Sequence, residues 1–355
     1  MAIKIKKDRI EFTANGASTF TLQETGNGFS FDGVIEGTNI FTDGYPGNFF
    51  GFSGAGYDPP ATPPRLIYSI EKFPFATNTN ASNHGDLLSA GTTGFSGASV
   101  SGKTSGYFAG GSNPSTDITT NIIQKFLFVT SANAVDISDL TVARNYSTSQ
   151  SSYTSGYVSG GYLNPGTPPF SLLNTIDKFP FSVDTNATDV GDLTRTSKNA
   201  SGQSSSVSGY TTGGYFTPPG PTSRSNIIDK FPFATDSNAT DVGDTLQVII
   251  RGAGHSSYTF GYNTGGSDGN NYLNTIQKFP FSADTNTTDV GDLTQIRSTF
   301  AGSSSTTHGY TSGGSYGPAP GILNTIEKFP FAADSNATDV ADLIAARAEP
   351  KGWQY

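Results

Sequence analysis

Apolar and polar residues alternate in a six-residue phrase, Ile-x-Lys-Phe-Pro-Phe, that recurs along the chain. Copies stand at 70–75, 123–128, 176–181, 228–233, 276–281 and 326–331, the second with Leu127 in place of proline. In an extended strand, alternate residues point to opposite faces. The two phenylalanines of each copy therefore share one face, and we predict that they lie in the core between neighbouring units.

The phrase belongs to a longer repeat that predicts four short strands. In residues 293–343 a run of small residues leads to Tyr310-Thr-Ser-Gly-Gly, then a Pro/Gly loop, the phrase itself, and a turn before Val340-Ala-Asp-Leu. The lysines of the six phrases recur at intervals of 48 to 53 residues. Four strands in about 50 residues are typical of a β-propeller blade. We predict an all-β protein whose residues 45–355 form a six-bladed propeller with four-stranded blades.

One copy carries a resemblance to a known family. Arg297, Ala-Gly-Ser-Ser, Gly-Tyr-Thr-Ser-Gly-Gly and the turn that begins at Asp334 follow one another in the order of a kelch repeat, and Arg251-Gly-Ala-Gly-His255-Ser is similar to its first part. The kelch tryptophan is replaced, as by Val340. The resemblance implies a kelch-like propeller and no particular function.

The two ends of the chain bear on how the ring closes. Residues 347–352 match 297–302 in spacing, so the C-terminus is expected to supply the innermost strand of the first blade. Residues 41–50 are the alternative source. Residues 1–44 lie outside the repeat. Three stretches of this segment are expected to be short strands with no partner of their own: Ile3-Lys-Ile-Lys, Arg9-Ile-Glu-Phe and Gly28-Phe-Ser-Phe-Asp-Gly-Val-Ile. The segment is expected to be an attachment segment or a cap of the propeller.

An aspartate follows each lysine of the phrase by fourteen residues. In a hairpin of fixed length the two positions are expected to lie opposite each other on one face. We predict structural ion pairs within a blade or across a blade boundary, namely Lys72–Asp86, Lys125–Asp139, Lys178–Asp192, Lys230–Asp244, Lys278–Asp292 and Lys328–Asp342.

The loops between the glycine doublets and the phrase differ in length and are rich in aromatic residues. Divergent loops on a rigid scaffold usually carry the binding surface. The candidate contacts for a glycan or a protein partner in these loops are Tyr57, Tyr162, Tyr215, Phe216, Tyr272 and Tyr316.

Composition excludes several function classes. The net charge is −9 and no basic cluster interrupts the repeats, so nucleic-acid binding is not expected. The chain has no cysteine, and its three histidines show no metal-ligand spacing. No catalytic set stands out either. We therefore expect no enzyme activity, no metal and no cofactor, and the absence of a long apolar run predicts no membrane insertion.

These observations favour a non-enzymatic structural or accessory protein of a bacteriophage virion. The chain is low in charge and rich in Gly, Ser, Thr and Asn, and its start lacks a secretion signal. Asp8-Arg-Ile-Glu-Phe and Gly28-Phe-Ser-Phe-Asp-Gly resemble virion proteins of cyanobacterial phages. We expect several copies in a particle that is assembled in the host cytoplasm and released by lysis. Residues 1–45 would bind other virion proteins, and the variable loops a host-surface glycan. A free lectin-like or protein-interaction propeller is the alternative.

Overall fold

The computed structural model describes most of the chain. The described residues are 2–5, 9–14, 17–25, 28–30, 47–58, 65–88, 96–112, 116–217, 223–317 and 321–355. The chain divides into two compact units, Met1–Asp43 and Gly44–Tyr355.

The first unit is a four-stranded antiparallel sheet. Its strands β1 (Ala2–Ile5), β2 (Arg9–Ala14), β3 (Ala17–Thr25) and β4 (Gly28–Ser30) lie side by side in chain order. The expectation that these strands lack partners is wrong, because each pairs with its neighbour in sequence. The strand that was not predicted is β3, in which Phe20 and Leu22 alternate with threonines. In the strand register, Phe20 pairs with Phe12 of β2 and Leu22 pairs with Ile10.

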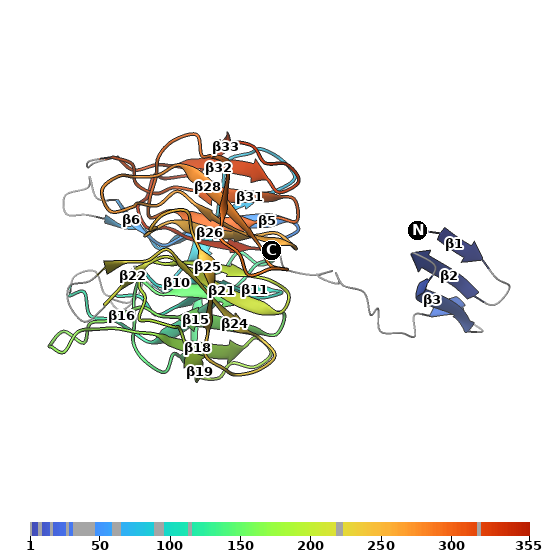
Figure 1. Cartoon of the computed structure of the whole chain (residues 1–355), viewed down its shortest axis with the longest axis horizontal. Coiled ribbons are helices and arrows are strands. Elements are labelled where there is room, and N and C mark those ends of the chain that lie inside the picture. The colour runs from blue at the N-terminus through green and yellow to red at the C-terminus, as the bar shows by residue number, and fades with distance from the viewer. Residues whose placement is uncertain are drawn as a thin grey trace. The chain divides into compact units, whose positions relative to one another are not determined.

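The second unit is a six-bladed β-propeller (Figure 1). Each blade is a four-stranded antiparallel sheet, and the described residues contain no helix. The predicted fold class is thus confirmed. From the axis outward, the strands of the six blades are β34 (Lys351–Gln354), β5 (Phe50–Gly54), β8 (Ser69–Pro74), β9 (Ser82–Asp86); β10 (Ala98–Ser101), β11 (Ser105–Ala109), β12 (Ile122–Leu127), β13 (Val135–Asp139); β14 (Thr148–Ser151), β15 (Ser155–Ser159), β18 (Thr175–Pro180), β19 (Thr188–Asp192); β20 (Ser201–Ser204), β21 (Ser208–Thr212), β24 (Ile227–Pro232), β25 (Thr240–Asp244); β26 (Ala253–Ser256), β27 (Phe260–Thr264), β28 (Thr275–Pro280), β29 (Thr288–Asp292); and β30 (Ala301–Ser304), β31 (His308–Ser312), β32 (Thr325–Pro330), β33 (Thr338–Asp342).

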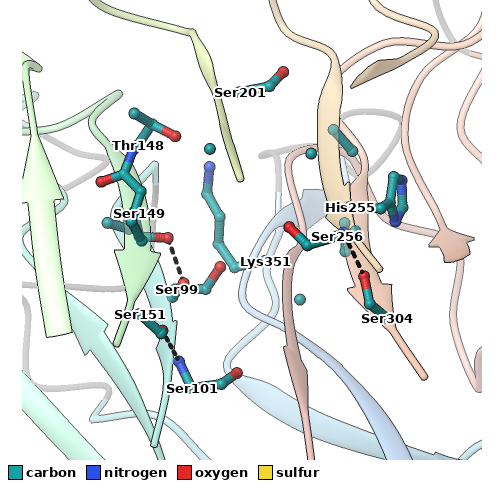
Figure 2. A pocket seen from close by; sticks show the side chains of 18 of the residues that line it. Ser99, Ser101, Thr148, Ser149, Ser151, Ser201, His255, Ser256, Ser304 and Lys351 are labelled. Carbon is teal, nitrogen blue, oxygen red and sulfur yellow. Dashed lines mark hydrogen bonds between the residues drawn. The ribbon is translucent and has the colours of Figure 1, made fainter. Parts of the chain in front are cut away.

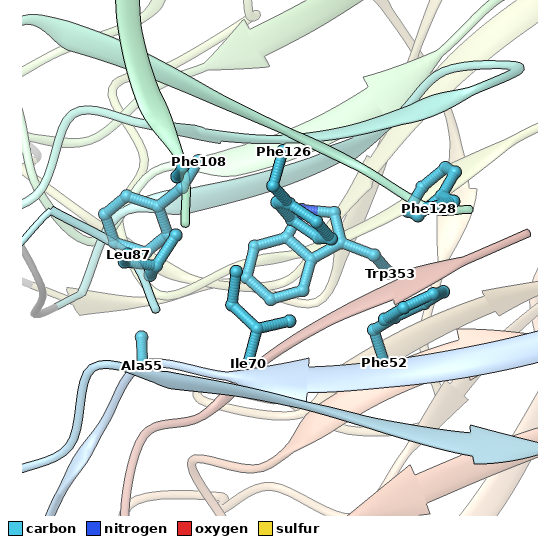
Figure 3. Packing of buried hydrophobic residues seen from close by; sticks show 9 residues of the cluster. Phe52, Ala55, Ile70, Leu87, Phe108, Phe126, Phe128 and Trp353 are labelled. Carbon is cyan, nitrogen blue, oxygen red and sulfur yellow. The ribbon is translucent and has the colours of Figure 1, made fainter. Parts of the chain in front are cut away.

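The C-terminal strand β34 completes the first blade. It pairs antiparallel with β5, so the first blade contains both the beginning and the end of the repeat region. Trp353 of β34 is fully buried between the first and second blades, and its indole Nε1 donates a hydrogen bond to the Tyr107 carbonyl at 2.7 Å. Figure 3 shows this ring among Ile70, Phe108 and Phe126.

Neighbouring blades are held together by a repeated aromatic contact. The second strand of each blade carries an aromatic residue that packs against both phenylalanines of the next blade's phrase; Tyr157, for example, lies with its ring centroid 5.5 Å from Phe231 and 4.8 Å from Phe233. The glycine before this residue makes room for the phrase of its own blade, since a Cβ at Gly209, which precedes Tyr210, would lie 2.4 Å from the Phe231 ring. The aromatic residues at this position are Phe52, Tyr107, Tyr157, Tyr210, Tyr262 and Tyr310.

The lysines of the phrase bind an aspartate other than the predicted one. Lys178 donates to Asp236 at 2.9 Å, in the turn of the following blade, instead of binding Asp192. A β-bulge after Ile176 shifts the pairing of the two outer strands, so that Lys178 faces Thr188 while Asp192 faces Thr175.

The same correction applies around the ring. The other observed ion pairs are Lys125–Asp184, Lys230–Asp284 and Lys278–Asp334, while Lys328 donates to Asn78 and Lys72 lies over the Phe50 ring. Such half-exposed pairs stabilise by about 0.2–1 kcal/mol each. The predicted partners Asp86, Asp139, Asp244, Asp292 and Asp342 face the residue three places before the lysine of their own blade.

Those aspartates join blades through their main chain instead. The Asp192 N–H donates to the Asn238 side-chain oxygen at 3.0 Å, and the Asp192 carbonyl accepts from the Ala239 N–H at 2.8 Å. The equivalent asparagine contacts recur at all six boundaries, at Asp86, Asp139, Asp192, Asp244, Asp292 and Asp342. The asparagine of each turn therefore fixes the edge of the preceding blade.

We predict that Trp353→Ala will destabilise the propeller by about 3–5 kcal/mol, because a large buried ring and its hydrogen bond are lost where the ring closes. Urea unfolding followed by far-ultraviolet circular dichroism measures the change. Val129→Ala, at a side chain that is 66% exposed, is the control and should change stability little. Equal effects of the two substitutions would contradict the proposed role of Trp353 in closure.

Candidate binding face and axial channel

All six predicted aromatic contacts lie in the variable loops that join the second and third strands of the blades. Tyr57, Tyr162 and Tyr215 each begin a two-residue hairpin strand, Tyr57 directly after Ala55-Gly56 and the other two after a glycine doublet: β6 (Tyr57–Asp58) with β7 (Arg65–Leu66), β16 (Tyr162–Leu163) with β17 (Ser171–Leu172), and β22 (Tyr215–Phe216) with β23 (Ser223–Arg224). Each tyrosine also forms an isolated β-bridge with a residue of a segment that leads into an innermost strand. The bridge partners of Tyr57, Tyr162 and Tyr215 are Ala348, Asn145 and Lys198, respectively. The three tyrosines are therefore held beside the axis of the ring.

The other three predicted residues lie in the same set of loops with different surroundings. Tyr272 pairs with Ser267 in an isolated β-bridge. Burial raises the pKa of Tyr57, the charge of Glu349 adds to this shift, Arg251 opposes it, and Tyr272 makes the smallest contribution. Phe216 lies under the Arg195 guanidinium, 4.6 Å from its ring centroid. Tyr316 is 43% exposed, and its N–H donates to the Gly321 carbonyl.

A ring of six residues surrounds the axis on this face, and we name it the mouth: Ser96, Tyr146, Asn199, Arg251, Thr299 and Glu349. All six have a positive φ of 52–59° without being glycine. Each N–H from Tyr146 to Glu349 donates to the carbonyl of the preceding member at 2.6–2.9 Å, and the Ser96 hydroxyl donates to the Glu349 carboxylate at 2.5 Å. A left-handed conformation costs energy for residues with a side chain, and at functional sites such strain is often retained. The mouth is thus a rigid backbone ring with six different side chains.

A lysine surrounded by tyrosines adjoins the mouth. The Lys198 ammonium lies 4.5 Å from the Tyr162 ring centroid, 5.8 Å from Tyr146 and 5.9 Å from Tyr215. Burial, and then the charge of Arg251, lower the pKa of Lys198. We refer to these four residues as the Lys198 cluster. It offers aromatic faces together with a partly desolvated cation.

Below the mouth, the six innermost strands enclose an axial channel. They contact one another in a closed cycle, and a cavity of about 130 Å³ lies between them, lined mostly by serine, glycine, alanine and threonine. The narrowness of the ring requires small residues, since a Cβ at Gly352 would lie 2.1 Å from the Gly302 carbonyl oxygen.

A second closed ring of hydrogen bonds lines the channel. The N–H of Ser101 donates to the Ser151 hydroxyl, and the same bond passes from blade to blade until the Gln354 N–H returns to the Ser101 hydroxyl. Its members, in order, are Ser101, Ser151, Ser204, Ser256, Ser304 and Gln354, at donor–acceptor distances of 3.0–3.3 Å. Every blade thus donates once and accepts once.

One charged side chain enters this channel. Lys351 extends into the space between Thr148 and Ser149 on one side and His255 and Ser256 on the other (Figure 2). Burial lowers its pKa, and the charge of Glu349 at the mouth opposes that shift.

Three buried arginine–carboxylate pairs hold the segments that lead from an outer strand back to an innermost one. Arg144 binds Asp177 at 3.0 Å, Arg297 binds Glu327, and Arg347 binds Glu71. Arg251, which the sequence aligned with Arg297, is instead exposed at the mouth. The position of Arg297 is filled in that blade by Ile249, whose carbonyl accepts from a glycine doublet as the Arg297 carbonyl does.

Sequence reasoning missed Tyr146, Lys198, Arg251, Glu349 and Lys351. A signal was present for Lys351, which replaces the small residues Ala98, Thr148, Ser201, Ala253 and Ala301 at the same place in the other innermost strands. The described residues contain no cluster of three His, Asp or Glu that could hold a metal ion. Among them there is also no helix long and apolar enough to span a membrane.

Comparison with known proteins supports the fold alone. No family model and no curated protein sequence matches this chain. The solved structure of YjhT is similar, with a TM-score of 0.61 and 11% sequence identity over 72% of this chain and 86% of that chain. Such a match shows that both chains share the propeller architecture.

We predict that the propeller loses stability in acid because of His255. Burial lowers the pKa of this fully buried imidazole from 6.5 to about 4. The unfolded chain therefore binds a proton that the folded chain does not. Stability from this group is complete above about pH 6.5 and is lost as the pH falls toward 4, by on the order of 3 kcal/mol in total.

His255→Gln should reduce this acid sensitivity, which urea unfolding at pH 7 and pH 4.5 measures. Glutamine is a matched replacement because Gln150 and Gln203 occupy the same position in β14 and β20. Burial also lowers the pKa of His308, so His308→Gln is the control and should leave the His255 contribution in place. If His255→Gln keeps the full wild-type pH dependence, the assignment fails.

Proposed function

We propose that this protein is a non-enzymatic binding module that recognises a ligand through the face bearing the mouth. The Lys198 cluster carries the proposal. Three tyrosine rings from two adjacent blades lie within 6 Å of one ammonium group, on the face that also bears Tyr57 and Tyr272. Aromatic side chains with one polar end are well suited to contact a partner that is partly apolar and partly polar.

A surface saccharide fits this face better than a nucleic acid or a membrane does. Sugar rings stack on tyrosine faces, and their hydroxyl groups accept hydrogen bonds from lysine and arginine. The carboxylate at the mouth, Glu349, already accepts a hydrogen bond from Ser96. A single carboxylate so engaged does not supply the acid and base of a glycosidase pair, which favours binding over hydrolysis.

We further propose that the protein is a bacteriophage virion component with its mouth directed toward the host. The support is the low-charge composition, the resemblance of the first thirty or so residues to phage virion proteins, and the division of the chain into a separate unit, Met1–Asp43, and the propeller. In this proposal the first unit binds other virion proteins, and several copies are present in one particle.

The saccharide proposal predicts that the double substitution Tyr162→Ala with Tyr215→Ala will weaken glycan binding at least tenfold. Binding of the full chain to an array of bacterial surface glycans measures the effect. Tyr153→Ala is the matched control, because Tyr153 is a 55% exposed tyrosine in the turn between β14 and β15, at the opposite end of the blade. Binding that survives the double substitution, or that Tyr153→Ala also removes, would refute the proposed face.

The virion proposal has its own test, which does not depend on the ligand. Mass spectrometry of purified particles from the phage that encodes the chain should detect it in several copies. A chain without residues 1–43 should then be missing from the particles while it still folds and binds glycan. Absence of the full chain from purified particles would refute the virion assignment and leave a free lectin-like propeller as the function.

A further inference from the structure

Lys351 is a half-buried cation with no protein counter-charge in the channel. It is the single charged side chain among the described residues that line the 130 Å³ cavity, and its ammonium group forms no hydrogen bond or ion pair with the described part of the chain. Its nearest acidic neighbour along the chain, Glu349, is bound to Ser96 at the mouth. Moving an unpaired charge even partly out of water costs free energy. A ligand of opposite charge would remove that cost.

A buried hydroxyl group without a partner lines the same cavity. The Ser147 hydroxyl has no hydrogen-bond partner, although the residue is only 7% exposed and lines both the channel and the mouth. Buried hydroxyl groups are nearly always hydrogen-bonded, so an unpaired one indicates a missing partner. Thr148 and Ser201 add hydroxyl groups around the Lys351 side chain (Figure 2).

The size and the entrance of the cavity restrict the ligand. Each water in the liquid takes about 30 Å³, so a cavity of about 130 Å³ holds only a few heavy atoms. The entrance is the mouth, where a smaller cavity of about 50 Å³ is lined by Arg251, Glu349 and again Lys351. The exposed Arg251 supplies a positive charge along the way in.

We propose that the axial channel is a binding site for one small inorganic oxyanion of the phosphate or sulfate class. In this site the Lys351 ammonium provides the counter-charge, and the hydroxyl groups of Ser147 and Thr148 donate hydrogen bonds to the anion. Charge-assisted hydrogen bonds of this kind are shorter and stronger than neutral ones. The anion would tie β34 to β14, which belong to different blades. This inference does not rest on the saccharide or virion proposals.

Titration calorimetry of the full chain with inorganic phosphate tests the site, in a buffer that contains neither phosphate nor sulfate. We expect one phosphate per chain with a Kd at or below about 1 mM, and at least tenfold weaker binding after Lys351→Ala. The substitution should fold, because Ala98, Ala253 and Ala301 occupy the same position in three other blades. Lys103→Ala removes an exposed lysine in the turn between β10 and β11 and should leave phosphate binding unchanged.

A crystal structure of the chain grown in sulfate locates the anion. Tetrahedral density beside Lys351 that is missing in the Lys351→Ala crystal supports the proposal. It is overturned if phosphate and sulfate show no binding at millimolar concentration, or if Lys351→Ala binds phosphate as tightly as the wild type. The proposal is also overturned if phosphate stabilises the folded chain no more than sodium chloride of the same ionic strength does. If the wild-type chain binds phosphate but no glycan, the result counts against the proposed function and leaves the anion site standing.

Discussion

The contact of one aromatic ring with two phenylalanines of the next blade is the interaction on which this structure depends. A blade of four short strands is small, and most of its apolar surface is buried only against its neighbours. The contact needs three conditions together: a glycine on the second strand, an aromatic residue after it, and the Phe-Pro-Phe phrase one blade further on. Gly156, Tyr157 and the Phe231–Phe233 pair meet these conditions. Removing one side chain would therefore weaken two blades at once.

The periodic features were predictable from the sequence, and the features that depend on register or on one blade were not. Six copies of one phrase predicted six blades and a phenylalanine core, because a repeated pattern states the same constraint six times. The lysine partner was mispredicted because a single bulge after Ile176 cannot be seen in residue spacing. The hydrogen bonds of the Asp192 main chain could not be predicted either, because they depend on the strand register and not on the type of side chain.

The candidate site shows the same difference between features that repeat in every blade and features of a single blade. Tyr57, Tyr162 and Tyr215 were found because they lie in the aromatic-rich loops of variable length, whose place in the repeat is known. Lys198 and Arg251 were missed because their importance comes from three-dimensional neighbours in other blades. The ring and the backbone of its mouth thus follow from the repeat. Residues that depart from the repeat determine the charge and aromatic character of one part of the mouth. Lys351 is the clearest departure, a long cation where five strands carry small residues.

The C-terminal position of β34 also has a consequence for the order of events during synthesis. The innermost strand of the first blade is synthesised after the other three strands of that blade and after the other five blades, so β5 has an open edge until β34 has been made. An open edge strand is a template for unwanted pairing with other chains. The cycle of serine hydroxyls cannot be completed before then either, because Gln354 is a member of it. A chain that ends before β34 would therefore leave the ring open, with β5 as an unpaired edge that is prone to aggregation.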